Sequence, residues 1–258
     1  MAMARRSAST AGIVLSQLEF DLLWADLGNG ESPYPLDVPS HGETREERDE
    51  LGERVFAGLS DAGFAGGDEL DPGIEDLFVL LGSPSLSVDA LVLGEQPWRM
   101  LAAVRGARGV LAVQDEKDLV LEPLRAAELV ATVGRMLGDG VPGPGDQLRL
   151  PRATFSAAMD GFARAGYDGF ERALSGAGIT GRSVRPLATM VTSARHAAGQ
   201  LAVNGVRGRS PVLSWFDTEA GRYAVTHEDV GGEAWVMVTP ADAAWLAARL
   251  GLLIDDVS

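Results

Sequence analysis

The side chains that most often carry out catalysis are sparse in this sequence. The chain has 3 histidines and no cysteine, so disulfides and thiolate metal sites are excluded. His41 falls in an expected loop, His196 on an expected helix and His227 at the end of an expected strand. No serine or aspartate stands in a recognisable nucleophile elbow, and the zinc-protease spacing HExxH is absent. We therefore predict surface or capping roles for the histidines, and no metal site.

Carboxylates and glycines offer two further kinds of chemistry. Residues 43–76 contain 12 acidic residues against three arginines. Paired carboxylates can act as the general acid and base of a glycosidase, but acidic pairs at helical spacing usually form the solvated face of a helix. The glycine-rich segment 138–145 lacks the lysine of a phosphate-binding loop and follows an expected helix, not a strand. The sequence predicts a protein that is not an enzyme and needs no cofactor.

The arginines instead favour contact with another protein. A net charge of −15 argues against nucleic acid as the partner. Residues 172–216 nevertheless contain no acidic residue. An acidic protein with one locally basic segment suggests a directed contact, although the simpler interpretation is that the two regions offset each other within the fold. The arginines of this segment are Arg172, Arg182, Arg185, Arg195, Arg207 and Arg209.

An amphipathic helix is predicted within this basic segment, from Ser183 as its N-cap to about Ala198. The interpretation we favour is that its apolar stripe packs in the core. The alternative is that part of the stripe lines a groove for a partner helix, with apolar burial supplying affinity and rim charges supplying orientation. The stripe consists of Val184, Leu187, Val191 and Ala194, with Met190 beside it, and the rim of Arg182, Arg185 and Arg195.

The elements that would position these side chains form a first series over residues 13–137. An edge strand at residues 13–15 precedes three helices. Two begin at the capping boxes Ser16-x-x-Glu19 and Thr44-x-x-Glu47, and the third at Asp71-Pro72. Four β-like runs follow, and their tight spacing allows only antiparallel hairpins. These runs are residues 86–93, 98–104, 109–113 and 119–121, and a helix over 124–137 closes the series.

A second series repeats this plan after a segment, 138–147, that is a linker by composition. A helix is predicted over residues 154–174, where Gly161, Gly166 and Gly169 indicate a break or a close backbone contact. The helix over 183–198 comes next. Four strands follow at residues 200–206, 212–216, 222–226 and 234–238. The final helix begins at Thr239-Pro240-x-Asp242.

The repeated series predict an α+β fold with two similar halves, residues 13–140 and 141–258. We expect the halves to be related by a pseudo-twofold axis and to share one central, mainly antiparallel sheet flanked by helical bundles. Residues 1–12 are interpreted as a disordered leader, because the apolar run after the two arginines is too short for a signal peptide. No apolar run reaches membrane-spanning length. We therefore expect a cytoplasmic protein without membrane insertion. The sequence leaves open whether the protein forms a homodimer.

Residues 208–226 combine a β-hairpin with a family resemblance. Residues 212–216 favour a strand, 217–221 form a short polar loop closed by glycine, and 222–226 return as the partner strand. An arginine, Arg222, is positioned to pair with Asp217. The string GRSP…FDT…GRY within this segment resembles the C-terminal half of the EspG family, which are ESX (type VII) secretion-associated proteins of actinobacteria.

Further pieces extend this resemblance over nearly the whole chain after residue 13. They are FDLLW at 20–24, PYPL at 33–36, HGETREER at 41–48, VTP at 238–240 and LAARL at 246–250. The resemblance implies two related halves around a shared sheet. It also implies a chaperone without enzymatic activity that binds the hydrophobic tip of a helical-hairpin secretion substrate, a PPE protein paired with PE or another WXG100-like protein.

The same resemblance implies where such a partner docks. Docking in the family involves the C-terminal helical bundle, the adjacent sheet and a hairpin loop of the first half. Mapped onto this chain, these regions are residues 179–195 and 94–97. The residues we expect to contact the partner are Ile179, Arg182, Val184, Arg185, Leu187, Met190, Val191, Arg195, Glu95 and Gln96.

A second hypothesis from another class is an acidic immunity or antitoxin-like protein that sequesters a toxin by charge complementarity. Its interface would be the acidic stretch 43–76. An enzyme acting on a small molecule is a third hypothesis, and it would require a polar pocket containing His196 or His227.

Overall fold

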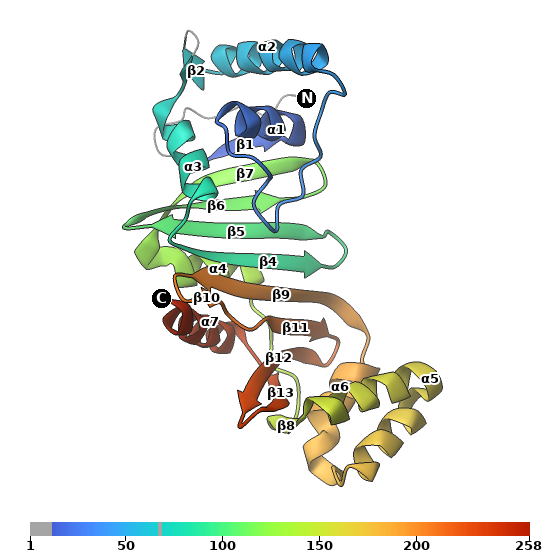
Figure 1. Ribbon diagram of the computed structural model, residues 1–258. Helices are drawn as coiled ribbons and strands as arrows, with labels where there is room; N and C mark the ends of the chain where they lie inside the picture. Colours follow the sequence, from blue (N-terminus) through green and yellow to red (C-terminus); the bar gives the residue numbers. More distant parts are fainter. Residues whose placement is uncertain (1–11, 67–68) are drawn as a thin grey trace.

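A single large antiparallel sheet organises the chain in the computed structural model, which describes residues 12–66 and 69–258 (Figure 1). The strand order is β1-β7-β6-β5-β4-β9-β11-β12-β13-β8, and β10 also pairs with β9. Every pairing within this sheet is antiparallel. The predicted α+β fold with a central antiparallel sheet is confirmed. The predicted leader falls almost wholly on residues outside the described part.

The first half, residues 13–140, forms one side of this sheet. A small separate hairpin, β2 and β3, lies between its second and third helices. Its elements are β1 (Ile13–Ser16), α1 (Gln17–Asp26), α2 (Arg45–Asp61), β2 (Ala65–Gly66), β3 (Glu69–Leu70), α3 (Pro72–Gly82), β4 (Leu86–Leu93), β5 (Trp98–Arg105), β6 (Arg108–Gln114), β7 (Asp118–Arg125), a 3₁₀ turn (Ala126–Glu128) and α4 (Leu129–Leu137).

The second half, residues 141–258, repeats the order of an edge strand, helices, a meander and a closing helix. The strand order of the two halves mirrors at the β4–β9 pair, where they meet. A rotation axis between the halves stays a prediction. The elements are β8 (Leu148–Pro151), α5 (Arg152–Gly176), a 3₁₀ turn (Gly181–Val184), α6 (Arg185–Thr192), β9 (Arg195–Gly205), β10 (Gly208–Arg209), β11 (Leu213–Thr218), β12 (Gly221–Val230), β13 (Glu233–Pro240) and α7 (Ala243–Val257).

The starts of α1, α2, α3 and α7 follow from local capping chemistry, as predicted, whereas the predicted N-cap Ser183 is replaced by Val184 in α6. Ser16 and Thr44 each accept a hydrogen bond from the backbone N–H three residues on, and Glu19 and Glu47 complete both capping boxes. Asp71 caps α3 and Asp242 caps α7. These side chains satisfy N–H groups that have no partner within their helices.

Helix α5 is a helical hairpin folded at one glycine, which accounts for its glycine content. Ala165 and Gly166 leave helical geometry, and Gly166 has a φ of 60°. A β-carbon on Gly161 would lie 2.5 Å from the Gly169 carbonyl oxygen. Both expectations for this segment, a break and a close backbone contact, are confirmed.

Two predicted helices are shorter than expected. The closing helix of the first half begins at Leu129 because β7 continues to Arg125. The helix predicted over 183–198 is α6, with Val184 at its N-cap, and it ends at Thr192. Residues 195–198 pair with β11 instead, because pairing in the sheet overrides their helical propensity. Gly199 fits this strand because a β-carbon there would lie 2.1 Å from the Trp215 ring.

Three hydrophobic clusters place the helices on the two faces of the sheet. Helices α1, α2 and α3 cover the first half on one face, and α5 and α6 cover the second half on that same face. Helices α4 and α7 pack together on the opposite face across the central strands. The register sets this division: Tyr223 and Val225 belong to the α5–α6 cluster, whereas Ala224 between them belongs to the α4–α7 cluster.

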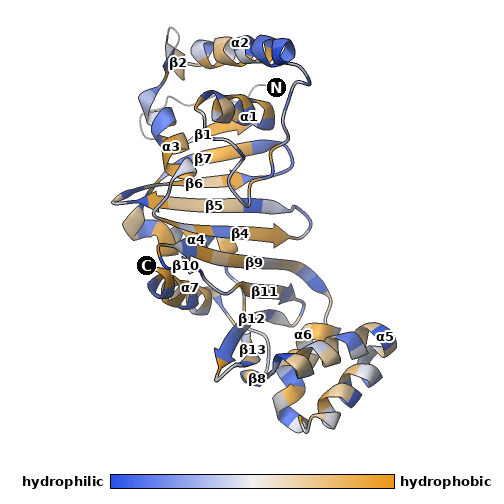
Figure 2. Cartoon of the chain, viewed as in Figure 1, coloured by the Kyte–Doolittle hydropathy of each residue, from blue (hydrophilic) through white to orange (hydrophobic). Residues whose placement is uncertain are grey.

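The central strands are therefore covered on one face only. On the face opposite α4 and α7, strands β4, β9 and β11 run between the two helical groups (Figures 1 and 2). The side chains on that face include Gln200, which is exposed although it lies in the middle of the sheet. Leu91 pairs with Gln200, and Gln200 pairs with Ser214. We call this surface the open face.

The connection between the halves is held firmly although its composition is that of a linker. The Arg222 guanidinium, 5% exposed, donates hydrogen bonds to the carbonyl oxygens of Leu137 and Gly138 and pairs with Asp217 at 2.5 Å. The Tyr223 hydroxyl donates to the Pro144 carbonyl. The backbone N–H of Gly143 donates to the Arg222 carbonyl. Arg222 and Tyr223 thus fix the connection onto β12.

Candidate partner-binding site

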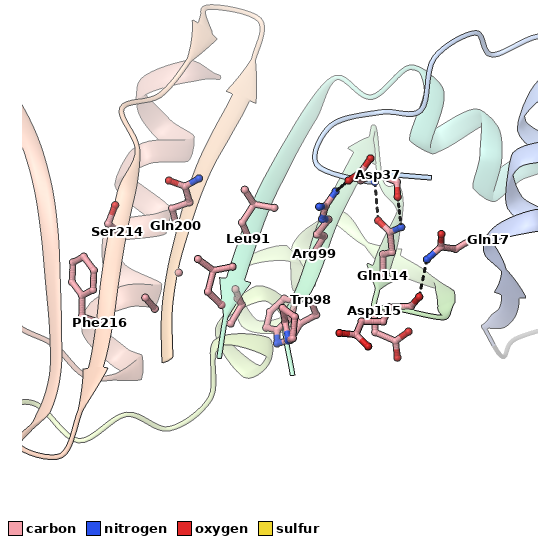
Figure 3. Close-up of a pocket in the computed structure, with 16 residues that line it drawn as sticks. Gln17, Asp37, Leu91, Trp98, Arg99, Gln114, Asp115, Gln200, Ser214 and Phe216 are labelled. Carbon is pink, nitrogen blue, oxygen red and sulfur yellow. Dashed lines mark hydrogen bonds and ion pairs between the residues drawn. The ribbon is translucent and has the colours of Figure 1, made fainter. Parts of the chain in front are cut away.

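A groove of 560 Å³ lies on the open face, between the helices of the two halves (Figure 3). Its floor is formed by alternate side chains of the central strands. Leu91 and Leu93 come from β4, Gln200 from β9, and Ser214 and Phe216 from β11. Leu93 is 65% exposed. The floor therefore combines apolar side chains with neutral polar groups, which is typical of protein-binding surfaces.

The first-half wall of the groove is a loop fixed to the sheet by polar side chains. The buried Gln114 accepts a hydrogen bond from the Asp37 backbone N–H and donates one to the Asp37 carbonyl, both at 2.8 Å. Arg99 pairs with the Asp37 carboxylate at 2.8 Å. Next to them, Gln17 donates to the Glu116 carbonyl. This wall is consequently set in place before any partner arrives.

The second-half wall begins at the start of β9. The Arg195 guanidinium lies 4.4 Å from the centroid of the Phe216 ring. The turn between β4 and β5 abuts this point, since a β-carbon on Gly94 would lie 3.4 Å from both Ala197 Cβ and the His196 carbonyl oxygen. The structure thus brings Arg195 to the same end of the groove as the turn that carries Glu95 and Gln96, which are both exposed.

A buried ion pair crosses the seam between the halves on the same face. Arg209 binds both carboxylate oxygens of Asp89, at 2.5 and 2.8 Å, and Asp89 is only 4% exposed. This carboxylate raises the pKa of Arg209 above its ordinary value. Asn204 donates to the same carboxylate. The Arg209 guanidinium also lies 5.5 Å from the Tyr34 ring centroid, so the pair links the loop of the first half to the second.

The string that carries the family resemblance has mainly structural roles. Arg209 forms the pair across the seam, and the buried Ser210 accepts a hydrogen bond from the Val203 backbone N–H. The predicted Arg222–Asp217 pair and the predicted hairpin are confirmed, with Thr218 opposite Gly221. Phe216 is the residue of this string that also lines the groove.

Several residues predicted to contact the partner lie elsewhere. Leu187 and Met190 are buried in the α5–α6 cluster, which supports the core interpretation of that stripe. Ile179, Val184 and Val191 are half-buried against the same cluster. Arg182 and Arg185 are exposed on the 3₁₀ turn and on α6, outside the groove lining. Arg195 is on a strand, not on the helix rim that was predicted.

The residues that sequence reasoning missed are the floor residues, above all Leu91, Leu93 and Phe216. The run LSVDALVL at 86–93 predicts a strand, but its pattern does not show which of its side chains face a partner. One signal was present: Leu93 directly precedes the polar turn at Gly94, where side chains are usually exposed. Only the pairing of β4 with β9 shows which of these side chains face the open side.

Two further kinds of feature would bear on function, a metal-binding cluster and a membrane-spanning helix. In this part of the chain, no group of three or more histidine, aspartate or glutamate side chains could hold a metal ion. Within the same residues, no helix has both the length and the apolar character to cross a bilayer. His227 lies on β12 and outside the groove lining, and burial together with the nearby Arg152 lowers its pKa.

The geometry defines a class of protein in which two similar α+β halves share one antiparallel sheet. The central strands of that sheet are uncovered on one face. A solved structure with this fold is that of the Mycobacterium tuberculosis type VII secretion system chaperone EspG5 in complex with a PE25–PPE41 dimer. The similarity has a TM-score of 0.77 at 18% identity and covers 96% of this chain and 97% of that chain. None of the curated proteins matches the sequence.

The sequence profile of the EspG family matches residues 16–251. The chain therefore belongs to the EspG family.

Proposed function

We propose that this protein is a substrate-specific chaperone of a type VII (ESX) secretion system. It binds the hydrophobic tip of a PPE-like helical-hairpin substrate and keeps that substrate soluble for export. The groove on the open face is the proposed docking site. The observation that carries the proposal is the exposed apolar floor around Leu93 in a chain of this family.

The shape of the groove supports a helical tip as its occupant. The floor is sheet between two helical groups, so a tip of two packed helices can lie on it with its apolar side chains over Leu91, Leu93 and Phe216. Leu93 is exposed next to Leu91 and Phe216 in one groove lining, and a contiguous apolar surface of this kind marks an interaction site. The similar chain EspG5 was solved with a PE25–PPE41 dimer, which supports the same class of partner here.

The remaining properties of the proposal follow from this role. The protein buries the hydrophobic tip of its substrate in the cytoplasm and releases it for export. It does so without catalysis or a cofactor. The halves 13–140 and 141–258 act as one binding unit, because β4 and β9 supply neighbouring parts of the floor. Of the residues predicted to contact the partner, the exposed Glu95, Gln96 and Arg195 lie at one end of the groove.

Co-expression tests this proposal. The chain is expressed with the small helical secretion-type proteins encoded beside it, and we expect one helical-hairpin protein or pair to become soluble and to co-purify. Leu93→Asp places a charge on the apolar floor and should abolish co-purification. Val206→Asp is the matched control, because Val206 is also exposed, at 80%, but lies beyond the opposite end of the β4–β9 pairing.

The outcome also separates the immunity hypothesis from the chaperone. Reversing Glu46, Asp49 and Glu50 on α2 should leave the partner bound, since α2 lies outside the groove lining. Glu47 is kept because its carboxylate caps this helix. If no helical-hairpin protein co-purifies, or if Leu93→Asp retains it as well as Val206→Asp does, the proposed function is wrong.

A further inference from the structure

The two walls of the groove carry opposite charge. On the first-half side, the turn between β6 and β7 places Asp115 and Glu116 in the groove lining. This turn continues with Lys117 and Asp118, so it holds three carboxylates and one ammonium group. On the second-half side, Arg195 stands exposed at the start of β9 and stacks on the lining residue Phe216. We call these the acidic wall and the basic wall.

The charges of the acidic wall are fixed in place. The Asp115 carboxylate accepts hydrogen bonds from the backbone N–H groups of Lys117 and Asp118, both at 2.8 Å. These bonds lower the pKa of Asp115. The neighbouring Asp37 and Arg99 are paired with each other, so they cancel and leave the turn as the source of negative charge (Figure 3).

The charge of the basic wall is oriented but not neutralised. The stacking on Phe216 restrains the Arg195 guanidinium and lowers the entropy it would lose on binding. In the described residues no carboxylate lies within ion-pair distance of Arg195, whereas Arg99, Arg209 and Arg222 each have one. Glu95 lies on the neighbouring turn between β4 and β5, which abuts His196. Arg195 is therefore free to pair with a carboxylate of a partner.

We infer that the groove sets the orientation of its partner by charge, an inference that rests on the proposed function. The occupant is a helical-hairpin tip whose two helices carry opposite charges. Its helix beside β9 and β11 carries carboxylates that contact Arg195, and its helix beside the β6–β7 turn carries a lysine or arginine that contacts Asp115 and Glu116. Apolar burial on the floor supplies the affinity, and the two walls exclude the tip rotated by half a turn.

The arrangement explains why a chain with a net charge of −15 keeps the unpaired Arg195 beside its groove. A uniformly acidic groove would repel any partner with carboxylates at its tip, whichever way the partner was turned. A groove with one wall of each sign repels only the wrong orientation, because there each wall meets its own charge.

The test uses the helical-hairpin protein that co-purifies with the chain, titrated against wild type and variants at low and high salt. Arg195→Glu is compared with Arg164→Glu, which makes the same change of charge at an exposed position of α5. Glu116→Arg is compared with Glu53→Arg on α2. We expect both groove variants to raise the dissociation constant at least about tenfold at low salt and only about twofold at 0.5 M salt, since exposed charges are screened.

Three results decide the inference. It is supported if both groove variants weaken binding in a salt-dependent way and both controls do not. It is overturned if Arg195→Glu behaves like Arg164→Glu, even where Leu93→Asp abolishes binding and the proposed function stands. It is equally overturned if Arg195→Glu weakens binding by the same factor at every salt concentration, because that result would show a packing role without an electrostatic one.

Discussion

Trp215 and Phe216 are neighbours on β11 and face opposite sides of the same sheet. Trp215 is 1% exposed and packs under α7 within the α4–α7 cluster. Phe216 is half-buried, lines the groove and carries Arg195 on its ring. The strand backbone is shared, so the difference arises only from what covers each face. One face of the central strands stabilises the protein, and the other is the proposed docking surface.

The largest effect expected from this comparison is on stability. Trp215→Ala should lower the free energy of unfolding by about 3–5 kcal/mol, because it leaves a cavity under α7. Phe216→Ala should lower it by about 1–2 kcal/mol, since that ring is already partly in water. Chemical denaturation followed by circular dichroism measures both. Equal losses would show that the two faces do not differ as described.

A second prediction concerns the ion pair that crosses the seam on the open face. Arg209→Met leaves the Asp89 carboxylate, 4% exposed, without its cation. The loss should be about 2–3 kcal/mol, below the value for a fully buried pair because Arg209 is itself 42% exposed.

The double variant Asp89→Asn with Arg209→Met is the control for this ion pair. It should recover more than half of the loss, because no buried charge is then left unpaired. Failure of this recovery would mean that Arg209 acts by packing alone.

A smaller effect is expected in α5, which covers the groove side of the second half. Gly166 has a φ of 60°, in the region that L-residues rarely adopt. Gly166→Ala should destabilise the protein by about 1 kcal/mol. Gly176→Ala, at a glycine of the same helix with open space around it, should have no such cost. Thermal unfolding compares the two, and binding to the groove should be unchanged in both.

The smallest effect is the pH dependence from His227. Burial and Arg152 lower its pKa below the usual 6.5. The unfolded chain therefore binds a proton more readily than the folded one, so this contribution to stability is complete above about pH 6.5 and is lost as the pH falls below it. His227→Gln should flatten the stability curve between pH 7 and pH 5. Arg152→Gln should flatten it in part, and an unchanged slope in both would contradict the assignment.

Local patterns predicted most of the fold. Capping boxes at Ser16 and Thr44 located two helices, and the tight turns after Leu93 and Arg105 fixed the antiparallel meander. Errors occurred where long-range pairing decides the structure. Residues 195–198 favour a helix locally, but their pairing with β11 makes them a strand. The edge strand β8 was missed because it follows the glycine-rich connection directly.

The site was harder to predict for the same physical reason. Arg195, Glu95 and Gln96 were expected to contact a partner, and the structure places them at one end of the groove. Leu187 and Met190 were also expected to contact a partner, but they are buried in the core. The core is the interpretation that the sequence favours for their stripe. The floor residues Leu91 and Phe216 could not be assigned to one face from the sequence, because the register between distant strands decides it.

The pairing of β4 with β9 has a consequence for protein synthesis. The ribosome makes Leu91 and Arg99 long before it makes Gln200 and Phe216, which complete the same floor. During translation the chain therefore passes through a long interval in which the first half is finished but has no surface for its client. If the proposed docking site is right, a client can be captured only after β9 and β11 have been made, and a chain that ends before Gln200 would not compete for it.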